Sequence, residues 1–423
     1  MEKIVSEMII SDMKDSIDPA QYGNQKNLSI QHYLVRLLHR IITNLDRNCK
    51  GEVNAVLCMF VDWKQAYSRQ CHTLGVKSFI NNGVRASLIP LLTSYFEDRE
   101  MRVKWHGVIS QPRKLPGGGA MGASLGNWEF LSQTNDNADC IPVDDRFKFV
   151  DDLTTLEIIN LINIGISSFR MQNQVPSDIP THGQYVEGEK LKSQKYLDQI
   201  NNWTNDHKMV ISEKKTKAMI FNFTDNFQFA TRLELKGKNI EMVDKMKILG
   251  TIVRSDLSWD DNCNLLIKKV NARMQLLRGV QGFGASTAEM VHLWTVFCRS
   301  VLEQSCAVWN SSLTQENKDD LERTQKTFAK LVLKEKYKNY EDALRTLNLD
   351  SLENRRNYLN LKFAQSGIKN ENLKDLFPLN DKQHKMKTRN NDKYEVMFAN
   401  TNRLKDGSII TMQKMLNDEE MKT

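Results

Sequence analysis

The sequence predicts an α+β protein in which a mixed α/β region extends to about residue 255 and an all-α region follows it. Residues 53–61 (VNAVLCMFV) are almost wholly apolar, as expected of a strand that is buried on both faces. Residues 147–156 are typical of a strand–turn–strand unit with two acidic residues at the turn. From about residue 262 onward, apolar residues recur at helical spacing, and this change of period marks the boundary between the two regions.

The other elements follow from periodicity and turn signals. Apolar residues recur every three to four positions in 29–46, where Ser29 can serve as the N-cap of an amphipathic helix. We expect further helices at 84–98, 127–136, 193–206, 262–280, 286–306, 315–334 and 340–366, and further strands at 101–108 and 217–223. The Gly-rich segment 112–126 and the polar segment 172–192 are predicted to be loops.

Composition is that of an ordinary globular protein. The chain has 423 residues, of which 40% are hydrophobic and 26% charged, and its formal net charge is +7. This mild excess of positive charge is compatible with a polyanionic partner without requiring one. The seven cysteines form no C-x-x-C pair, so neither a disulfide framework nor a zinc site is indicated, and we expect a reducing compartment.

The sequence contains no apolar run of membrane-spanning length. Its N-terminal segment, residues 1–9, lacks the apolar core of a signal peptide. We therefore expect an intracellular protein, nuclear or cytoplasmic, that is not secreted and has no membrane partner.

Two acidic sites suggest phosphoryl-transfer chemistry. Asp62 directly follows the apolar strand, where a carboxylate is costly unless a partner such as a divalent metal neutralises it. Asp151 and Asp152 are adjacent at the predicted hairpin tip, where two like charges raise each other's pKa and attract a cation. Taken separately, Asp62 is better explained as a helix N-cap, and the Asp pair as a polar turn. Together they could hold two Mg²⁺ ions, which prefer oxygen ligands.

A Gly-rich loop lies between these two acidic sites. Residues 115–126 contain five glycines, which allow a ligand to approach the backbone closely. No Gly-Lys-Ser/Thr follows, so the segment is not a Walker A loop. A flexible surface loop is the alternative interpretation.

The order of these motifs resembles the reverse transcriptases of LINE-type (jockey-like) non-LTR retrotransposons, over about residues 5–370. The matching segments are Gln21–Gly23, Asp62–Tyr67, Leu115–Gly126, Phe149–Asp152, Trp203 with Lys214–Phe221, Ile248–Gly250 with Asp256–Trp259, Arg299–Glu303, Val308–Thr314 and Leu321–Lys326. The resemblance implies a right-hand polymerase palm, an antiparallel sheet with helices on one face. It also implies partial fingers over residues 1–50, the palm over 51–255, a helical thumb-like domain over 256–370 and a mobile polar tail over 371–423.

The resemblance also assigns roles to individual residues. Asp62, Asp151 and Asp152 would be catalytic and bind two Mg²⁺ ions, with carboxylates on the order of 4–8 Å apart. Lys215 would approach the phosphates of the incoming nucleotide and donate a proton to pyrophosphate; taken alone, it is equally explained as a solvated lysine. Tyr67, Met121 and Gly122 would contact the dNTP, Tyr67 as an aromatic gate against the ribose 2′-hydroxyl.

Basic residues in the predicted thumb suggest contact with an RNA template and a DNA primer. Arg323, Lys326, Lys330 and Lys334 recur at helical spacing, and Lys268, Lys269, Arg273 and Arg278 repeat the pattern on the preceding helix. A solvated helix face is the alternative. Protein partners are not indicated by the sequence.

Two departures bear on activity. Ala120-Met121 stands where most relatives have Pro-Gln, and Met cannot replace the hydrogen bonds of Gln. Ser68 stands where many relatives have a second Asp that is not a metal ligand. Upstream fingers and an endonuclease domain are also expected to be missing, as in a truncated copy. The leading hypothesis is an RNA-directed DNA polymerase, and the alternative is a catalytically silent nucleic-acid-binding remnant. An RNA-templated RNA polymerase is a third reading, which Tyr67 disfavours.

Overall fold

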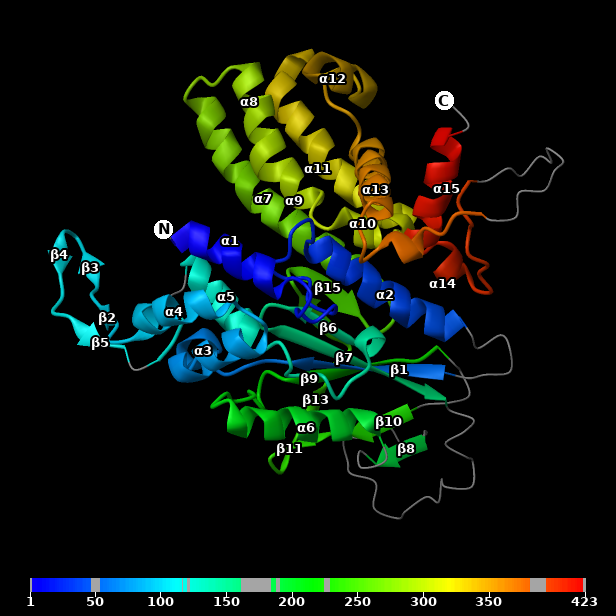
Figure 1. Ribbon diagram of the computed structural model, residues 1–423. Helices are drawn as coiled ribbons and strands as arrows, with labels where there is room; N and C mark the ends of the chain where they lie inside the picture. The colour runs from blue at the N-terminus through cyan, green and yellow to red at the C-terminus, as the bar shows by residue number, and fades with distance from the viewer. Residues whose placement is uncertain are drawn as a thin grey trace. The chain divides into compact units, whose positions relative to one another are not determined.

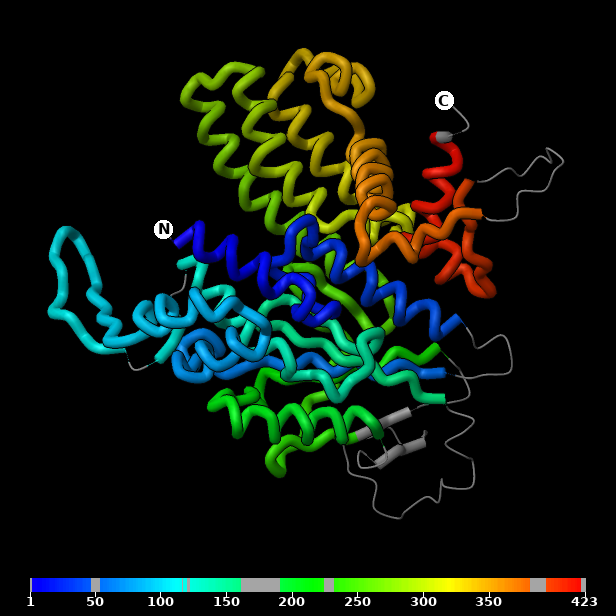
Figure 2. The backbone as a smooth tube through the Cα atoms, viewed as in Figure 1, coloured from blue at the N-terminus to red at the C-terminus, as the bar shows by residue number. Residues whose placement is uncertain are grey.

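Figure 1 shows a computed structural model of the chain, which describes residues 2–46, 54–115, 117–119, 122–160, 184–187, 191–223, 229–380 and 393–420. These residues form two compact units, and each is made of two separate stretches of chain. Unit 1 comprises Met1–Ser29 and Ala55–Val243, and unit 2 comprises Ile30–Asn54 and Asp244–Thr423. Figure 2 traces the backbone through both units.

Unit 1 is built on a five-stranded sheet of strand order β13-β9-β1-β7-β6. The strands are β1 (Asn54–Val61), β6 (Arg146–Phe149), β7 (Asp152–Asn160), β9 (Lys217–Phe221) and β13 (Glu241–Met242). Pairs β1–β9 and β6–β7 are antiparallel, whereas β13 runs parallel to β9. All eight residues of β1 are buried, as its apolar sequence predicted. Because β1 and β7 are neighbours, the expectation that segments 53–61 and 147–156 share one sheet is confirmed.

Helices complete unit 1, so the mixed α+β prediction is confirmed. Its helices are α1 (Glu2–Met13), α3 (His72–Asn81), α4 (Ile89–Phe96), α5 (Ser124–Gln133) and α6 (Lys192–Asp206). Apolar residues of α1, α3, α4 and α5 form one core, which includes Ile9, Phe79 and Leu92. Helix α6 lies along the sheet and contacts β7. The sequence analysis did not predict α3.

The other strands described in unit 1 are short. They are β2 (Glu100–Met101), β3 (Lys104–Trp105), β4 (Val108–Ile109), β5 (Arg113–Lys114), β8 (Gln184–Glu187), β10 (Phe229–Arg232), β11 (Glu234–Leu235) and β12 (Lys238–Asn239). The predicted single strand 101–108 is instead part of a hairpin. His106 and Gly107 have φ values of 45° and 84°, and such a pair turns the chain back on itself.

Among its described residues, unit 2 is helical apart from one hairpin, β14 (Lys245–Ile248) with β15 (Thr251–Arg254). Its helices are α2 (Ile30–Asp46), α7 (Asp260–Gly282), α8 (Thr287–Leu293), the π-helix η7 (Trp294–Arg299), α9 (Ser300–Leu302), α10 (Cys306–Trp309), α11 (Gln315–Leu333), α12 (Tyr340–Leu347), α13 (Leu352–Ile368), α14 (Asn402–Lys405) and α15 (Ser408–Glu420). Helix α7 packs against α11, and buried Trp294 stacks on Phe328 with ring centroids 4.5 Å apart. The predicted helix 286–306 is broken, because η7 widens it and Ser305 has φ 52°.

Short 3₁₀ turns connect several of these elements. They are η2 (Tyr67–Arg69), η3 (Ala86–Leu88), η4 (Val143–Asp145), η8 (Asn310–Ser312), η9 (Lys334–Lys336) and η10 (Lys374–Leu376).

The division of the chain differs from the expected one at both ends. Helix α2, assigned to the fingers in the sequence analysis, lies in unit 2 and contacts α10, α14 and α15. The prediction of a mobile tail is wrong for residues 393–420. Helix α15 buries Ile409, Ile410 and Met412, because its few apolar residues fall on one side despite the polar composition. No helix among the described residues combines the length and apolar character needed to cross a membrane.

Candidate active site

Asp62 occupies the position just beyond β1 that its sequence predicted. Its backbone is fixed from both directions: its carbonyl accepts a hydrogen bond from Ser212 N at 2.8 Å, and its N–H donates to Thr216 Oγ1 at 3.3 Å. These bonds link the end of β1 to the segment before β9. Within the described residues, Asp62 Oδ1 is buried and accepts no hydrogen bond. It lies 3.4 Å from the Lys215 ammonium without a hydrogen bond, so the Asp62 carboxylate keeps the capacity to accept a metal ion.

The β6–β7 hairpin presents Asp151 and Asp152 at a two-residue turn, in which Phe149 pairs with Asp152. Val150, the first residue of the turn, has φ 58°. A β-branched residue rarely adopts this conformation, which persists only where its surroundings hold it. The tip of the hairpin is therefore a strained position that needs support.

Gln21 and Gly23 provide that support. Gln21 Oε1 accepts hydrogen bonds from Val150 N at 3.0 Å and from Gly23 N at 2.9 Å. A Cβ atom at Gly23 would lie 2.5 Å from Val150 Cγ2, so only glycine fits there. Gln21 also forms a parallel β-bridge with Lys148 of β6, in which Tyr22 N donates a hydrogen bond to Lys148 O at 2.8 Å. The Gln21-Tyr22-Gly23 motif thus lies directly against the acidic hairpin.

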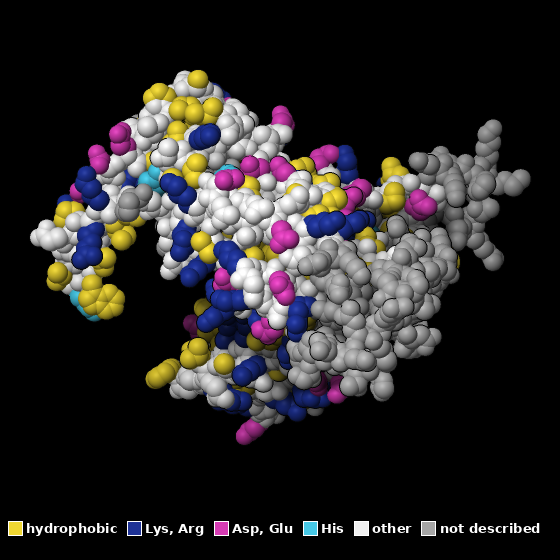
Figure 3. All heavy atoms as spheres, turned by 90° about the horizontal axis from the view of Figure 1, so that it is seen from below, with side chains coloured by type: hydrophobic (Ala, Val, Ile, Leu, Met, Phe, Trp, Pro, Cys, Tyr) yellow, Lys and Arg dark blue, Asp and Glu magenta, His cyan; other side chains and the backbone are white. Residues whose placement is uncertain are grey.

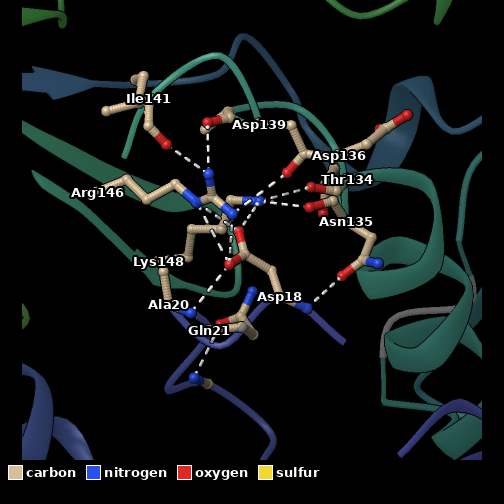
Figure 4. A network of polar contacts seen from close by, with 12 residues as sticks. Asp18, Ala20, Gln21, Thr134, Asn135, Asp136, Asp139, Ile141, Arg146 and Lys148 are labelled. Carbon is tan, nitrogen blue, oxygen red and sulfur yellow. Dashed lines mark hydrogen bonds and ion pairs between the residues drawn. The ribbon is translucent and has the colours of Figure 1, made fainter. Parts of the chain in front are cut away.

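A buried ionic network anchors the base of this hairpin (Figure 4). Lys148 Nζ lies 2.7 Å from Asp18 Oδ2, and both side chains are only 2–3% exposed. Arg146 Nη2 lies 3.0 Å from Asp18 Oδ1. Lys148 Nζ also donates to the carbonyl of Asn135 at 2.6 Å. Burial would raise the pKa of Asp18, but the charges and hydrogen bonds of Lys148 and Arg146 outweigh it and hold that pKa below its ordinary value.

The three carboxylates interact electrostatically. Partial desolvation raises the pKa of Asp151, and the negative charge of Asp62 raises it further. The positive charge of Lys215 opposes the shift. The pKa of Asp152 rises to about 6, first by desolvation and then by the charges of Asp151 and Asp62. Both hairpin side chains keep contact with solvent. Mutual repulsion of this kind is relieved when a cation binds between the carboxylates.

We call Asp62, Asp151 and Asp152 the acidic group. Lys215 lies beside it, with its Nζ 3.4 Å from Asp62 Oδ1 and its side chain 69% exposed. The donor set of three carboxylates and a neighbouring ammonium suits Mg²⁺ and a phosphate group. In the part of the chain that the structure describes, no three His, Cys, Asp or Glu side chains are arranged to hold a metal ion. Convergence of Asp62, Asp151 and Asp152 on shared ions therefore stays a prediction.

Tyr67 is placed next to the acidic group. Desolvation raises the pKa of its phenol to about 12, and the charge of Asp151 contributes to the shift. The ring stacks on Phe130 with centroids 4.7 Å apart, and the hydroxyl donates to Asn127 Oδ1 at 3.4 Å. Both partners belong to α5, so the fold holds the ring in one orientation.

The Gly-rich loop lies against the segment that carries Tyr67. Gly119 N donates to Tyr67 O and Gly118 N donates to Gln70 O, both at 2.8 Å. A Cβ atom at Gly119 would lie 1.8 Å from Gln70 Oε1, so a larger residue there would displace the end of the Gln70 side chain. Gly122 has φ 88° just before α5. Met121 lies outside the described residues.

The predicted nucleic-acid-binding residues lie on α7, on α11 and just beyond it, in unit 2. The exposed ones are Lys268, Arg323, Lys326, Lys330 and Lys334, whereas Lys269 and Arg273 are half-buried. Some already have partners: Arg323 pairs with Asp320 at 2.7 Å, and Arg273 donates to the Phe297 carbonyl. The opposite side of α11 is buried through Leu321 and Phe328. The basic face is therefore accessible, and its ligand stays a prediction.

Three residues near the site were not foreseen as important. Gln21 entered only as part of a motif, and Lys148 and Glu129 were not singled out at all. Lys148 stands between two phenylalanines in β6, and a charged residue in such a strand is a usable signal. Glu129 is fully buried in α5, and its two carboxylate oxygens make no hydrogen bond within the described residues.

The fold and the acidic group define a class: an α+β protein with carboxylates at a strand end and at an adjacent hairpin tip. No protein-family model matches the chain. Its sequence is 24% identical over 259 residues to a Drosophila melanogaster protein described as a probable RNA-directed DNA polymerase from transposon BS. The match includes 61% of this chain and 26% of that protein, so the chain spans about a quarter of its relative.

Solved telomerase structures show a weaker likeness. Apo telomerase from Candida tropicalis has 12% identity and a TM-score of 0.43, covering 87% of this chain and 58% of that chain. Telomerase from Candida albicans with a fragment of telomeric RNA has 10% identity and a TM-score of 0.36, covering 89% and 57%. The sequence match and the ordered motifs carry the classification: the chain is a reverse transcriptase-like protein.

Proposed function

We propose that this chain carries the palm of an RNA-directed DNA polymerase from a LINE-type, non-LTR retrotransposon. The observation that carries the proposal is the placement of Asp62 just beyond β1 and of Asp151 and Asp152 at the tip of the β6–β7 hairpin, since β1 and β7 are neighbouring strands of one sheet. The transposon polymerase matched in sequence supports the same reaction, RNA-templated transfer of a nucleotide to a primer.

Each residue has a distinct role in the proposed reaction. Asp62, Asp151 and Asp152 would hold two Mg²⁺ ions, which would activate the primer 3′-hydroxyl and neutralise the leaving pyrophosphate. Lys215, beside Asp62, would neutralise phosphate charge and donate a proton to pyrophosphate. Tyr67, fixed against Phe130, would exclude a nucleotide with a 2′-hydroxyl.

The remaining assignments concern domains and partners. Residues 1–50 would form partial fingers, residues 51–255 the palm and residues 256–370 a helical thumb-like domain. The basic face of that domain would contact the template–primer phosphates. We expect the protein in the nucleus or cytoplasm.

Primer extension tests the proposal. The full chain is incubated with an RNA template, a DNA primer, dNTPs and Mg²⁺. The Asp151→Asn variant should lose extension by at least about a hundredfold, because a neutral amide cannot replace a carboxylate ligand, and duplex binding should change little. The matched control is Asp144→Asn, which removes the charge of an exposed carboxylate outside the acidic group.

The competing function is a silent nucleic-acid-binding remnant. It would be favoured if the chain binds the duplex but never extends the primer. If the chain does not bind duplex, both functions are excluded, because both depend on the basic face of unit 2.

A further inference from the structure

A projecting β-hairpin in unit 1, residues 99–114, is not used by the proposed chemistry. We call it the 99–114 arm. Strand β2 pairs with β5 and β3 pairs with β4, and His106-Gly107 makes the two-residue turn. Val103 and Ser110 join the two pairs through a backbone hydrogen bond of 2.9 Å. In Figure 1 the arm extends away from α4 and the rest of its unit.

The arm exposes large apolar side chains along its length. Exposed fractions are 52% for Met101, 59% for Val103, 73% for Trp105, 72% for Val108 and 57% for Ile109. A two-stranded hairpin is marginally stable in water unless it packs against something. Exposed apolar side chains gathered on one element indicate an interaction surface.

The partner is indicated by charge. Residues 99–114 contain five basic residues and one acidic residue, a net charge of 5 − 1 = +4. Lys114 pairs with Asp98 at 3.1 Å, and Arg99 lies 4.5 Å from the ring centroid of Tyr95. Arg102, Lys104 and Arg113 make no ion pair within the described residues and are exposed. In Figure 3 basic and hydrophobic side chains gather at the left of the view, where the arm lies.

Strand alternation separates these side chains into two sets. Met101, Val103 and Trp105 occupy alternate positions and so point to one side, and Val108 is opposite Trp105. Arg102 and Lys104 occupy the intervening positions, with Ile109 opposite Lys104. Arg113 is opposite Met101 and therefore shares the side of Trp105. An aromatic ring at the tip with cations beside it fits a strand whose bases can stack and whose phosphates are negative. A protein partner of comparable fit would have to be strongly acidic.

We infer that the 99–114 arm binds single-stranded nucleic acid, namely an unpaired stretch of the template RNA. Trp105 stacks on an unpaired base, and Arg102, Lys104 and Arg113 contact phosphates. The identification of the bound strand as template RNA rests on the proposed function. The chemistry of binding, which is base stacking and neutralisation of phosphates, does not depend on that function.

The test measures binding of the full chain to a labelled, unstructured RNA oligonucleotide by fluorescence anisotropy at two salt concentrations. Trp105→Ala should weaken binding by about tenfold, and Trp105→Phe should restore most of it, because stacking needs an aromatic face. The triple variant Arg102→Ala/Lys104→Ala/Arg113→Ala should lower the slope of log affinity against log salt by about 2. A DNA oligonucleotide of the same sequence tests whether the 2′-hydroxyl contributes.

The matched control removes three exposed lysines elsewhere in unit 1, in Lys195→Ala/Lys236→Ala/Lys238→Ala. It loses the same charge and should keep near-normal affinity and slope. The inference is overturned if Trp105→Ala and the arm triple variant bind RNA as the control does. It is also overturned if Trp105→Ala changes only self-association of the chain. Loss of primer extension with intact arm-dependent RNA binding would count against the proposed polymerase alone.

Discussion

Gln21 holds Val150 at the tip of the acidic hairpin: Gln21 Oε1 accepts a hydrogen bond from Val150 N at 3.0 Å, while Val150 has φ 58°. The two residues are 129 positions apart in sequence. The same oxygen accepts a bond from Gly23 N, so one side chain fixes both the supporting segment and the hairpin. The geometry of Asp151 and Asp152 therefore depends on a residue outside the acidic group.

Replacing Gln21 with Ala is expected to destabilise unit 1 by about 1–2 kcal/mol, because two backbone N–H groups lose their acceptor. Primer extension should fall more than duplex binding, since the hairpin tip is no longer fixed. Urea unfolding and extension assays measure the two effects. Gln194→Ala is the control, because Gln194 makes comparable hydrogen bonds to Glu234 on an exposed surface. Equal effects of the two substitutions would contradict the role given to Gln21.

The buried pair of Asp18 and Lys148 makes a second prediction. Asp18→Asn leaves the Lys148 ammonium without its charged partner in a site only 3% exposed, and should cost about 3–5 kcal/mol in free energy of unfolding. Asp12→Asn is the matched control, since Asp12 pairs with the half-exposed Arg85 and should cost less than about 1 kcal/mol. Adding Lys148→Met to Asp18→Asn should recover part of the loss. Similar unfolding midpoints for the two single variants would argue against the buried pair.

Glu129 gives a prediction for pH. Burial raises its pKa from 4.5 to about 8, with Arg99 opposing the shift, so the folded protein keeps this carboxyl protonated at neutral pH. Between pH 4.5 and 8 the folded state binds a proton that the unfolded state has released. Stability should therefore fall as pH rises through this window, by about 1.4 kcal/mol per pH unit.

Glu129→Gln removes this dependence, because the amide cannot ionise. Chemical unfolding at pH 5.5 and pH 8 should show the variant gaining stability relative to wild type at the higher pH. Glu97→Gln, at an exposed position, should follow the wild-type profile. Parallel pH profiles for wild type and Glu129→Gln would show that Glu129 is ionised in the folded protein.

Tyr67 makes a prediction for substrate choice. If its ring excludes the ribose 2′-hydroxyl, Tyr67→Ala should raise ribonucleotide incorporation relative to deoxyribonucleotide incorporation by about tenfold or more. Tyr67→Phe should retain discrimination, because it keeps the stack on Phe130 and loses only the hydroxyl bond to Asn127. The measurement is the ratio of kcat/KM values for the two nucleotides. An unchanged ratio in Tyr67→Ala would remove Tyr67 from the nucleotide site.

Elements with a local signal could be predicted from the residues alone. The apolar run before Asp62 predicts β1, and the Phe-rich segment around Asp151 and Asp152 predicts the hairpin, since burial on a strand imposes an alternating or continuous apolar pattern. Most of the helices after residue 255 follow from the same logic. The predicted convergence of Asp62 with Asp151 rests on the order of the motifs and has no local signal of its own.

Tertiary structure alone decided which distant groups meet. The contact of Gln21 with Val150, the pairing of Asp18 with Lys148 and the burial of Glu129 join segments that carry no local pattern for these contacts. Assignment of α2 to the second unit, and the burial of α15, were decided in the same way. A hydrogen bond or ion pair between residues more than a hundred positions apart depends on how sheets and helices pack, and the period of a single segment does not encode that packing.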